Sequence, residues 1–186
     1  MSTKQRILDS ALRLLQTRSY AGFSFQDVAD EVGIRKASIY SHFPSKEALA
    51  LAALQHTEST FELEVKTWEI HPAKEQFDHL LDWFRRLSVG GERVCPGGSF
   101  ASTWSSTPPV LQASVIQFIN GQLERFERII VQGLAEGSIQ TNGLPTRQWA
   151  LLLLSNIQGA LQMARITGKG RTLDIMIERT KFELFT

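Results

Sequence analysis

Apolar side chains recur with the period of about 3.6 residues of an α-helix along almost all of this 186-residue chain. No run alternates apolar and polar residues in the way that a half-buried β-strand requires. Capping residues and helix breakers divide the chain into about nine periodic segments. These segments lie at residues 2–19, 24–32, 35–42, 46–68, 71–88, 95–106, 107–135, 145–166 and 172–185. The sequence therefore predicts an all-α protein of about nine helices.

The composition is that of a globular protein, because 42% of the residues are hydrophobic. The most apolar segment, residues 149–166, is about as long as a membrane helix but contains Asn156, Gln158 and Arg165, which favours burial against protein. The start of the chain has no signal-peptide core, and the single cysteine cannot form an internal disulfide. We therefore expect a cytoplasmic protein that does not contact a membrane.

The first 46 residues have the turn chemistry of three short helices. Ser24 and Asp27 have the spacing of a capping box, Gly33 follows the second helix directly, and Ser45 is placed to cap the fourth. Residues 1–46 also carry seven basic and four acidic side chains, a formal charge of +3 on a chain whose net charge is +1. Three short helices with a glycine turn before the third are typical of a helix-turn-helix unit.

In such a unit the third helix lies in the major groove of DNA, so its residues must divide by face. Ile34, Ile39 and Phe43 suit the inner face. The polar, basic or small residues left on the outer face, together with the start of the next helix, are Arg35, Lys36, Ala37, Ser38, Tyr40, Ser41, His42 and Lys46. The small ones allow close approach to base edges, whereas the tyrosine, histidine and final lysine suit phosphate oxygens. The other interpretation, a polar face on a purely structural helical hairpin, stays open.

Residues 23–54, FSFQDVADEVGIRKASIYSHFPSKEALALAAL, resemble the DNA-binding region of the tetracycline-repressor (TetR) family. The resemblance covers about residues 3–52. The positions that match the family pattern are Ser24, Ala29, Gly33, Tyr40, Ser41, His42, Phe43, Lys46, Glu47 and Leu49. The chain departs from the family at Ser19, where a glycine is frequent, at Phe25, where a threonine is common, and at Ser41, where a second tyrosine is frequent. The resemblance adds Ser24 to the candidate DNA contacts.

The resemblance implies a homodimer that represses transcription on double-stranded DNA and is released by a small-molecule effector, with no cofactor and no enzymatic activity. It implies a DNA-binding domain at residues 1–46 and a regulatory, dimer-forming domain at residues 47–186. We expect the effector to tilt the fourth helix and so to change the separation of two DNA-binding heads.

The segment 145–166 supports a dimer on its own, because it is apolar on nearly every face. The candidate interface residues on this helix and the last one are Leu152, Asn156, Gly159, Ala160, Met163 and Met176. A helix fully buried in a monomer is the alternative.

Aromatic residues concentrate in the middle of the chain, where the resemblance implies a ligand cavity. The candidate pocket residues are Phe61, Trp68, Trp83, Phe84, Phe100, Trp104 and Phe118. Ordinary core packing is the alternative for each of them.

Cys95 is a candidate redox sensor, since it lies beside Arg93 and at the expected start of a helix. An inert thiol is the alternative.

His71 and His79 do not have metal-ligand spacing, so we expect no metal site. No nucleophile–base spacing predicts an enzyme. The competing function is a helical small-molecule-binding or thiol-sensing protein whose helix-turn-helix head is only structural.

Overall fold

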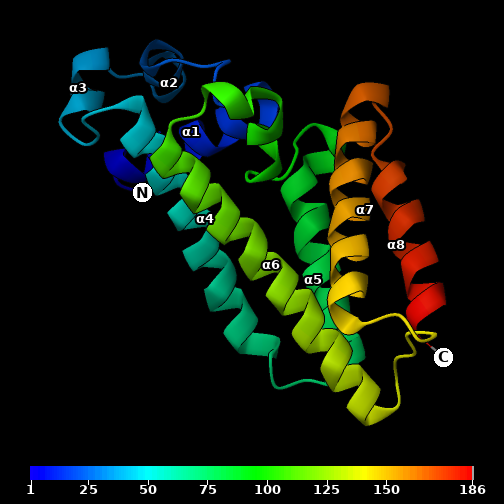
Figure 1. Ribbon diagram of the computed structural model, residues 1–186. Helices are drawn as coiled ribbons and strands as arrows, with labels where there is room; N and C mark the ends of the chain where they lie inside the picture. The colour runs from blue at the N-terminus through cyan, green and yellow to red at the C-terminus, as the bar shows by residue number, and fades with distance from the viewer. Residues whose placement is uncertain (186) are drawn as a thin grey trace. The chain divides into compact units, whose positions relative to one another are not determined.

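The computed structural model describes residues 1–185 and is helical throughout (Figure 1). Its elements are α1 (Thr3–Arg18), α2 (Phe25–Val32), α3 (Lys36–Tyr40), α4 (Lys46–Trp68), α5 (Ala73–Ser88), the 3₁₀ turn η1 (Val89–Gly91), the 3₁₀ helix η2 (Gly98–Ser106), α6 (Pro109–Glu136), α7 (Thr146–Thr167) and α8 (Arg171–Leu184). Extended pairing within residues 1–185 amounts to one isolated antiparallel bridge between Ile139 and Phe185. The predicted all-α fold is confirmed, and each of the nine predicted segments is helical.

The chain forms two compact units, which are described separately below. The first contains Met1–Glu62 and Pro96–Phe118, and the second contains Leu63–Cys95 and Ile119–Thr186. The division therefore falls within α4 and within α6. It groups residues by their packing, and the functional boundary at residue 46 stays a prediction.

In the first unit, the capping residues act as the sequence predicts. The Ser24 hydroxyl accepts hydrogen bonds from the backbone N–H groups of α2, and the Asp27 carboxylate accepts one from the Ser24 N–H at 2.8 Å. Gly33 ends α2 in the left-handed conformation, with φ 71° and ψ 41°. The Ser45 Oγ accepts a hydrogen bond from the Ala48 N–H at 3.1 Å and so caps α4.

The core of the first unit holds these short helices in place. Ile7 and Leu14 of α1, Ile39 of α3 and Leu49 of α4 are fully buried, and Phe43 is 4% exposed. Burial of one such side chain stabilises a fold by about 1.5–3 kcal/mol. The five-residue helix α3 is too short to be stable alone, so its position depends on Ile39 and Phe43.

In the second unit, α7 and α8 lie side by side (Figure 1). Ion pairs join α8 to α5, since the Arg85 Nε lies 2.9 Å from the Asp174 carboxylate and the Lys181 Nζ lies 2.6 Å from that of Asp78. Among the described residues, no helix has the length and apolar character needed to cross a membrane.

The first turn of α5 is capped from another helix. Pro72 precedes α5 and offers no side-chain hydrogen bond, and instead Glu136 of α6 accepts one from the Ala73 N–H at 2.9 Å. Hydrogen bonds from the Gln132 side chain and from the Ala73 N–H lower the pKa of Glu136. This contact fixes the end of α6 against the start of α5.

Candidate nucleic-acid interface

The structure exposes most of the outer face that the sequence predicts for α3. Ile39 and Phe43 point into the core, so the remaining side chains of this segment face away from it. The exposed residues are Arg35, Lys36, Ala37, Tyr40, Ser41 and His42, and the half-buried ones are Ser38 and Lys46. The candidate DNA contacts of α3 therefore share one accessible face.

Two contacts order this face. The ring of Tyr40 packs edge-on against Phe25 of α2, with 4.9 Å between ring centroids. The Ser41 hydroxyl donates a hydrogen bond to the Ser38 carbonyl at 2.7 Å. Tyr40 remains 53% exposed beside this contact, so its side chain is accessible from solvent.

Ser24 lies at the edge of this face but is already engaged. Its hydroxyl donates to Asp27 at 2.6 Å and accepts from the backbone N–H of Gln26 at 3.2 Å. A hydroxyl has one proton and two lone pairs. Ser24 also accepts from the Asp27 N–H at 3.4 Å, so its proton and both lone pairs are in use, and a donation to phosphate would break its bond to Asp27.

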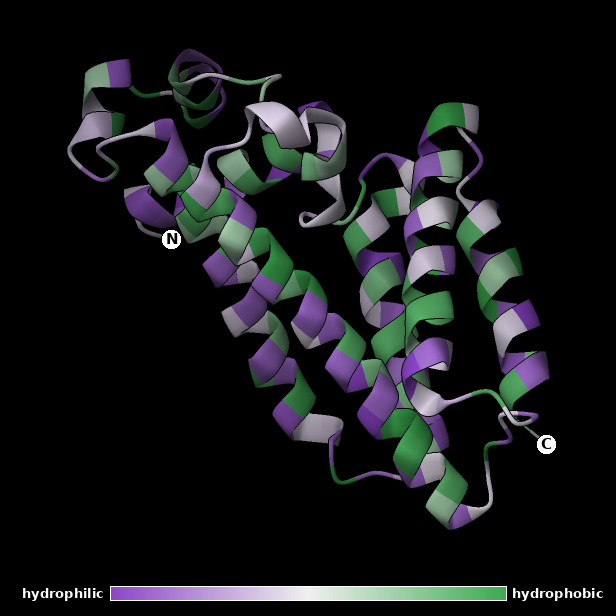
Figure 2. Cartoon of the chain, viewed as in Figure 1, coloured by the Kyte–Doolittle hydropathy of each residue, from purple (hydrophilic) through white to green (hydrophobic). Residues whose placement is uncertain are grey.

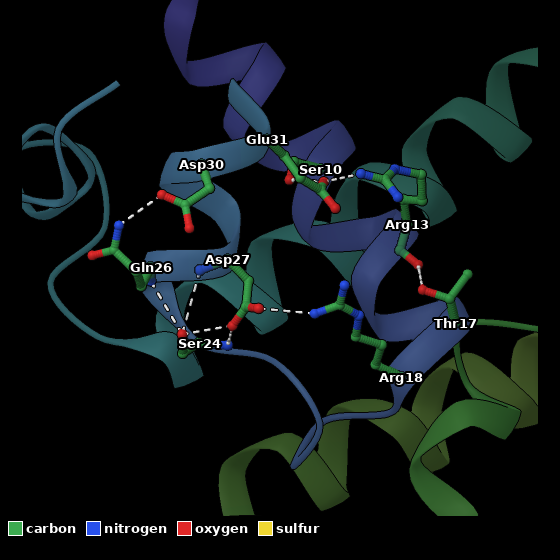
Figure 3. A network of polar contacts seen from close by, with 9 residues as sticks. All are labelled: Ser10, Arg13, Thr17, Arg18, Ser24, Gln26, Asp27, Asp30 and Glu31. Carbon is green, nitrogen blue, oxygen red and sulfur yellow. Dashed lines mark hydrogen bonds and ion pairs between the residues drawn. The ribbon is translucent and has the colours of Figure 1, made fainter. Parts of the chain in front are cut away.

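The acidic residues of α2 are directed to partners that hold them in place (Figure 3). Asp27 pairs with Arg18 of α1 at 2.8 Å, and Glu31 binds both Arg13 and the Ser10 hydroxyl. Hydrogen bonds from the side chain and backbone of Ser24, followed by that from Arg18, lower the pKa of Asp27. Both pairings tie α2 to α1.

The segment 33–45 contains no acidic residue, while Arg35 and Lys36 are exposed on it. The positive charge of α3 is therefore not balanced locally. An uncompensated cationic helix face with small side chains at its centre is suited to a DNA groove.

Lys46, predicted to contact phosphate, lies in an environment that the sequence did not indicate. Its Nζ is 4.6 Å from the ring centroid of Tyr20 and 4.7 Å from that of Phe23. Burial lowers the pKa of Lys46, and the Asp27 charge partly opposes this. Tyr20 and Phe23 lie in the break between the predicted helices at residues 2–19 and 24–32. No local pattern could have found the contact, because it joins residues far apart in the chain.

A stripe on the outer side of α7 matches the predicted dimer interface. Leu152, Asn156, Gly159 and Met163 are exposed at alternating spacings of four and three residues. Ile166 continues the stripe and is 76% exposed. Figure 2 shows hydrophobic residues recurring along α7. We call these five residues the α7 stripe.

The other interface candidates lie elsewhere. Ala160 is 4% exposed and belongs to the core of its own unit, and Met176 of α8 is half-buried. Ile175 and Phe182 of α8, which the sequence analysis did not select, are 69% and 75% exposed. Their separation of seven residues, two helical turns, was the available signal.

The structure does not gather the predicted effector residues into one unit. Trp68, Trp83 and Phe84 belong to the second unit, and all three are buried there. The four candidates in the first unit are Phe61, Phe100, Trp104 and Phe118. Of these, Trp104 is 37% exposed and the other three are buried.

Phe84 packs as an ordinary core residue. Its ring is parallel to that of Phe126, with 6.2 Å between centroids, and Phe77 meets Phe126 edge-on. An open hollow of about 480 Å³ lies on α6 and is lined by Glu124, Glu127, Arg128, Val131, Gln132 and Ala135. None of the predicted effector residues lines this hollow.

The thiol of Cys95 is fully buried, so an oxidant would reach it only through local opening of the structure. Within residues 1–185, no three His, Cys, Asp or Glu side chains are grouped in a way that could hold a metal ion.

Comparison with known proteins assigns both the N-terminal and the C-terminal part of the chain to a family. Residues 7–53 match the family model of bacterial regulatory proteins of the tetR family, and residues 74–179 match that of the tetracyclin repressor-like C-terminal domain. The second match alone covers more than half of the chain. The chain belongs to the TetR family of bacterial transcriptional regulators.

Individual relatives agree with this assignment. The chain is 24% identical over 173 residues to the HTH-type transcriptional repressor DhaR of Mycobacterium sp. strain GP1, a match that covers 92% of this chain and 86% of that protein. It is similar in fold to a TetR-family regulator from Agrobacterium tumefaciens, with a TM-score of 0.90, 23% identity and coverage of 99% and 98% of the two chains. A TetR regulator from Legionella pneumophila gives a TM-score of 0.84 at 29% identity, with the same coverage.

These matches establish a DNA-binding transcriptional regulator and favour repression. They do not favour the alternative in which the helix-turn-helix head is only structural. Membership of a family of regulators also implies that the protein is not an enzyme.

Proposed function

We propose that this protein is a homodimeric repressor that binds a palindromic operator through α3 and leaves it when a small-molecule effector binds. The observation that carries the proposal is the outer face of α3, which is exposed, positively charged and free of acidic residues. Such a face offers both phosphate contacts and close approach to base edges.

The residues of this face divide by their chemistry. Ala37 and Ser38 lie on the short helix itself and are small enough to meet base edges. Arg35, Lys36 and His42 are exposed donors for phosphate oxygens, and the Tyr40 hydroxyl is a further one. Ser24, Ser41 and Lys46 complete the proposed contacts, and a bond from the Ser24 hydroxyl to phosphate would replace the one that it donates to Asp27.

The dimer is proposed to form through α7 and α8. The α7 stripe has the spacing of a helix that packs along a partner helix, and Gly159 at its centre permits close approach of two backbones. Nothing lies within 4 Å of the position that a Cβ would take at Gly159, so the protomer itself does not require a glycine there. A second copy of the chain would account for both the exposed apolar residues and this glycine.

The effector is proposed to act through α4. This helix runs without a break from Lys46, beside the DNA-binding face, to Trp68, one of the candidate pocket residues. An effector that binds better to one head separation than to the other shifts the dimer towards that separation. Release follows when the heads no longer match half-sites roughly 34–36 Å apart, one turn of DNA. We place the functional boundary between the DNA-binding head and the regulatory domain at residue 46. We also expect the protein to act in the cytoplasm.

A titration with duplex DNA at several salt concentrations tests the proposal. Purified full-length protein should bind duplexes of random sequence, and the affinity should fall steeply as salt rises because phosphate contacts release counterions. Native mass spectrometry of the same sample should report the mass of a dimer. A protein that leaves duplex DNA unbound at low salt would instead support a helix-turn-helix head with only a structural role.

A further inference from the structure

Two aromatic rings hold the ammonium group of Lys46 in one place. The distances from Nζ to the ring centroids of Tyr20 and Phe23 are nearly equal, at 4.6 and 4.7 Å. Rings attract a cation without neutralising it, unlike a carboxylate partner. The ammonium group of Lys46 therefore remains available to a phosphate while its side chain is already ordered.

Ordering matters because a free lysine side chain loses rotamer entropy when it is fixed. Between the rings of Tyr20 and Phe23 this loss occurs on folding rather than on DNA binding. A lysine that merely lay along an apolar surface would place its methylene groups, and not its Nζ, over the rings. The geometry of Lys46 is that of a preorganised cation.

Tyr20 is itself held by η2. Its ring stacks on Phe100, with 5.7 Å between centroids and 24° between planes, and Phe100 is fully buried. The neighbouring Ser19 Oγ lies 3.2 Å from the Ser102 Oγ of the same helix. All of these residues belong to the first compact unit, so the contacts join η2 directly to the start of α4.

The helix η2 should change conformation more readily than the α-helices near it in the chain. It consists of short 3₁₀ segments on either side of a kink at Thr103, whose angles of φ −123° and ψ 20° are not helical. Its first turn is closed by a long hydrogen bond of 3.4 Å from the Phe100 N–H to the Gly97 carbonyl. Phe100 therefore lies in a segment of low intrinsic helical stability.

We propose that Tyr20 and Phe23 are positioning residues that hold Lys46 ready for a DNA phosphate, and that Phe100, through Tyr20, makes this contact depend on the conformation of η2. The inference rests on the proposed DNA binding. It adds a way of weakening that binding that does not require α4 to move as a whole. A change in η2 that withdraws Phe100 frees the Tyr20 ring, and Lys46 then binds phosphate only after being ordered again.

The test compares Tyr20→Phe, Tyr20→Leu, Phe100→Leu and Lys46→Gln with the wild-type protein, all as full-length chains. Two quantities are measured: the salt dependence of binding to random duplex DNA, and the pKa of Lys46 from the ¹³C signals of methylated lysines, assigned by loss of the signal in Lys46→Gln. Phe126→Leu, a change to a fully buried phenylalanine of the second unit, is the matched control for core damage.

We expect Tyr20→Phe to behave as the wild type, because the ring remains. Tyr20→Leu and Phe100→Leu should lower the slope of log affinity against log salt by about 0.9 per lost phosphate contact, or roughly 2 for a dimer. In both variants the pKa of Lys46 should rise towards its ordinary value, and adding Lys46→Gln should cause little further loss. The Phe126→Leu control should keep the wild-type slope and the wild-type pKa of Lys46.

The inference is overturned if Tyr20→Leu and Phe100→Leu keep the wild-type slope, or if Lys46→Gln has no effect on it. Should Phe100→Leu fail to fold, the pair Tyr20→Phe and Tyr20→Leu decides the matter. A wild-type protein that does not bind duplex DNA overturns the proposed function together with this inference, whereas wild-type binding with unchanged slopes overturns only the inference.

Discussion

The ring of Tyr40 meets that of Phe25 edge-on, with 4.9 Å between centroids and 68° between planes. The exposed aromatic residue of α3 thus packs against α2 through its ring. Phe25 occupies a position where the TetR family commonly has a threonine. This chain therefore supports its Tyr40 with an aromatic contact that a threonine could not make.

The two roles of Tyr40 can be separated by Tyr40→Phe. The ring contact with Phe25 remains, so the melting temperature should stay the same, while the proposed hydrogen bond to phosphate is lost. We expect affinity for operator and for random duplex to fall by a similar factor, about tenfold or more, since one hydrogen bond to a charged group is worth about 1.5–3 kcal/mol. Fluorescence anisotropy with both duplexes measures this. An effect confined to one sequence would show that Tyr40 reads a base.

Ser38→Ala should change sequence preference instead of overall affinity. The Ser38 carbonyl accepts the bond from Ser41 and is unaffected, so the change removes only the side-chain hydroxyl. Discrimination at one base pair of each half-site should weaken by about 1–3 kcal/mol, while affinity for random duplex stays constant. Lys36→Gln is the matched comparison and should weaken binding to all sequences alike. The reverse pattern would refute the assignment of base and phosphate contacts.

Helix boundaries were predictable because local chemistry sets them. Ser24, Gly33 and Ser45 cap or end helices through hydrogen bonds and backbone angles within a few residues, and each acts as expected. The turn η1 was not predicted. In it Val89 adopts a positive φ of 45°, which is unfavourable for a β-branched residue and which no local sequence pattern indicates. Gly91 there lies so near Gly170 that a Cβ would come within 3.1 Å of its Cα.

The site was only partly predictable, because local sequence determines only some of its contacts. Periodicity placed Ile39 inside and Lys36 outside, and the structure agrees. It could not place Trp104, which is partly exposed, or pair Lys46 with Tyr20, since these depend on contacts between distant segments.

Ser19→Gly should stabilise the protein. Ser19 has φ 64° and ψ 173°, a region that is favourable almost only for glycine and costs other residues about 1–3 kcal/mol. The greater freedom of glycine in the unfolded chain offsets part of this gain. We expect a net stabilisation of about 1 kcal/mol and a melting temperature higher by about 2–4 °C. Ser19→Ala keeps the strain and loses the contact with Ser102, so it should not stabilise; equal gains in both variants would contradict the explanation.

Gly159→Leu should convert the dimer to a monomer. The added side chain meets open space within the protomer, so folding should be unaffected, but it would separate two α7 helices that cross at this position. Gly121→Leu is the matched control, because the Cβ position at Gly121 on α6 is also open. Sedimentation velocity should show a monomer for the first variant and a dimer for the second. A dimeric Gly159→Leu protein would place the interface elsewhere.

The central claim, that a dimer reads a palindromic operator through α3, is tested most directly by selection of bound sequences from a pool of random duplexes. We predict enrichment of two inverted half-sites with centres roughly 34–36 Å apart, or a multiple of this spacing. With the Ser38→Ala protein, the preference should change at the same position in both halves. Enrichment of a single unpaired site, or no enrichment from a pool that the protein binds, would contradict the claim.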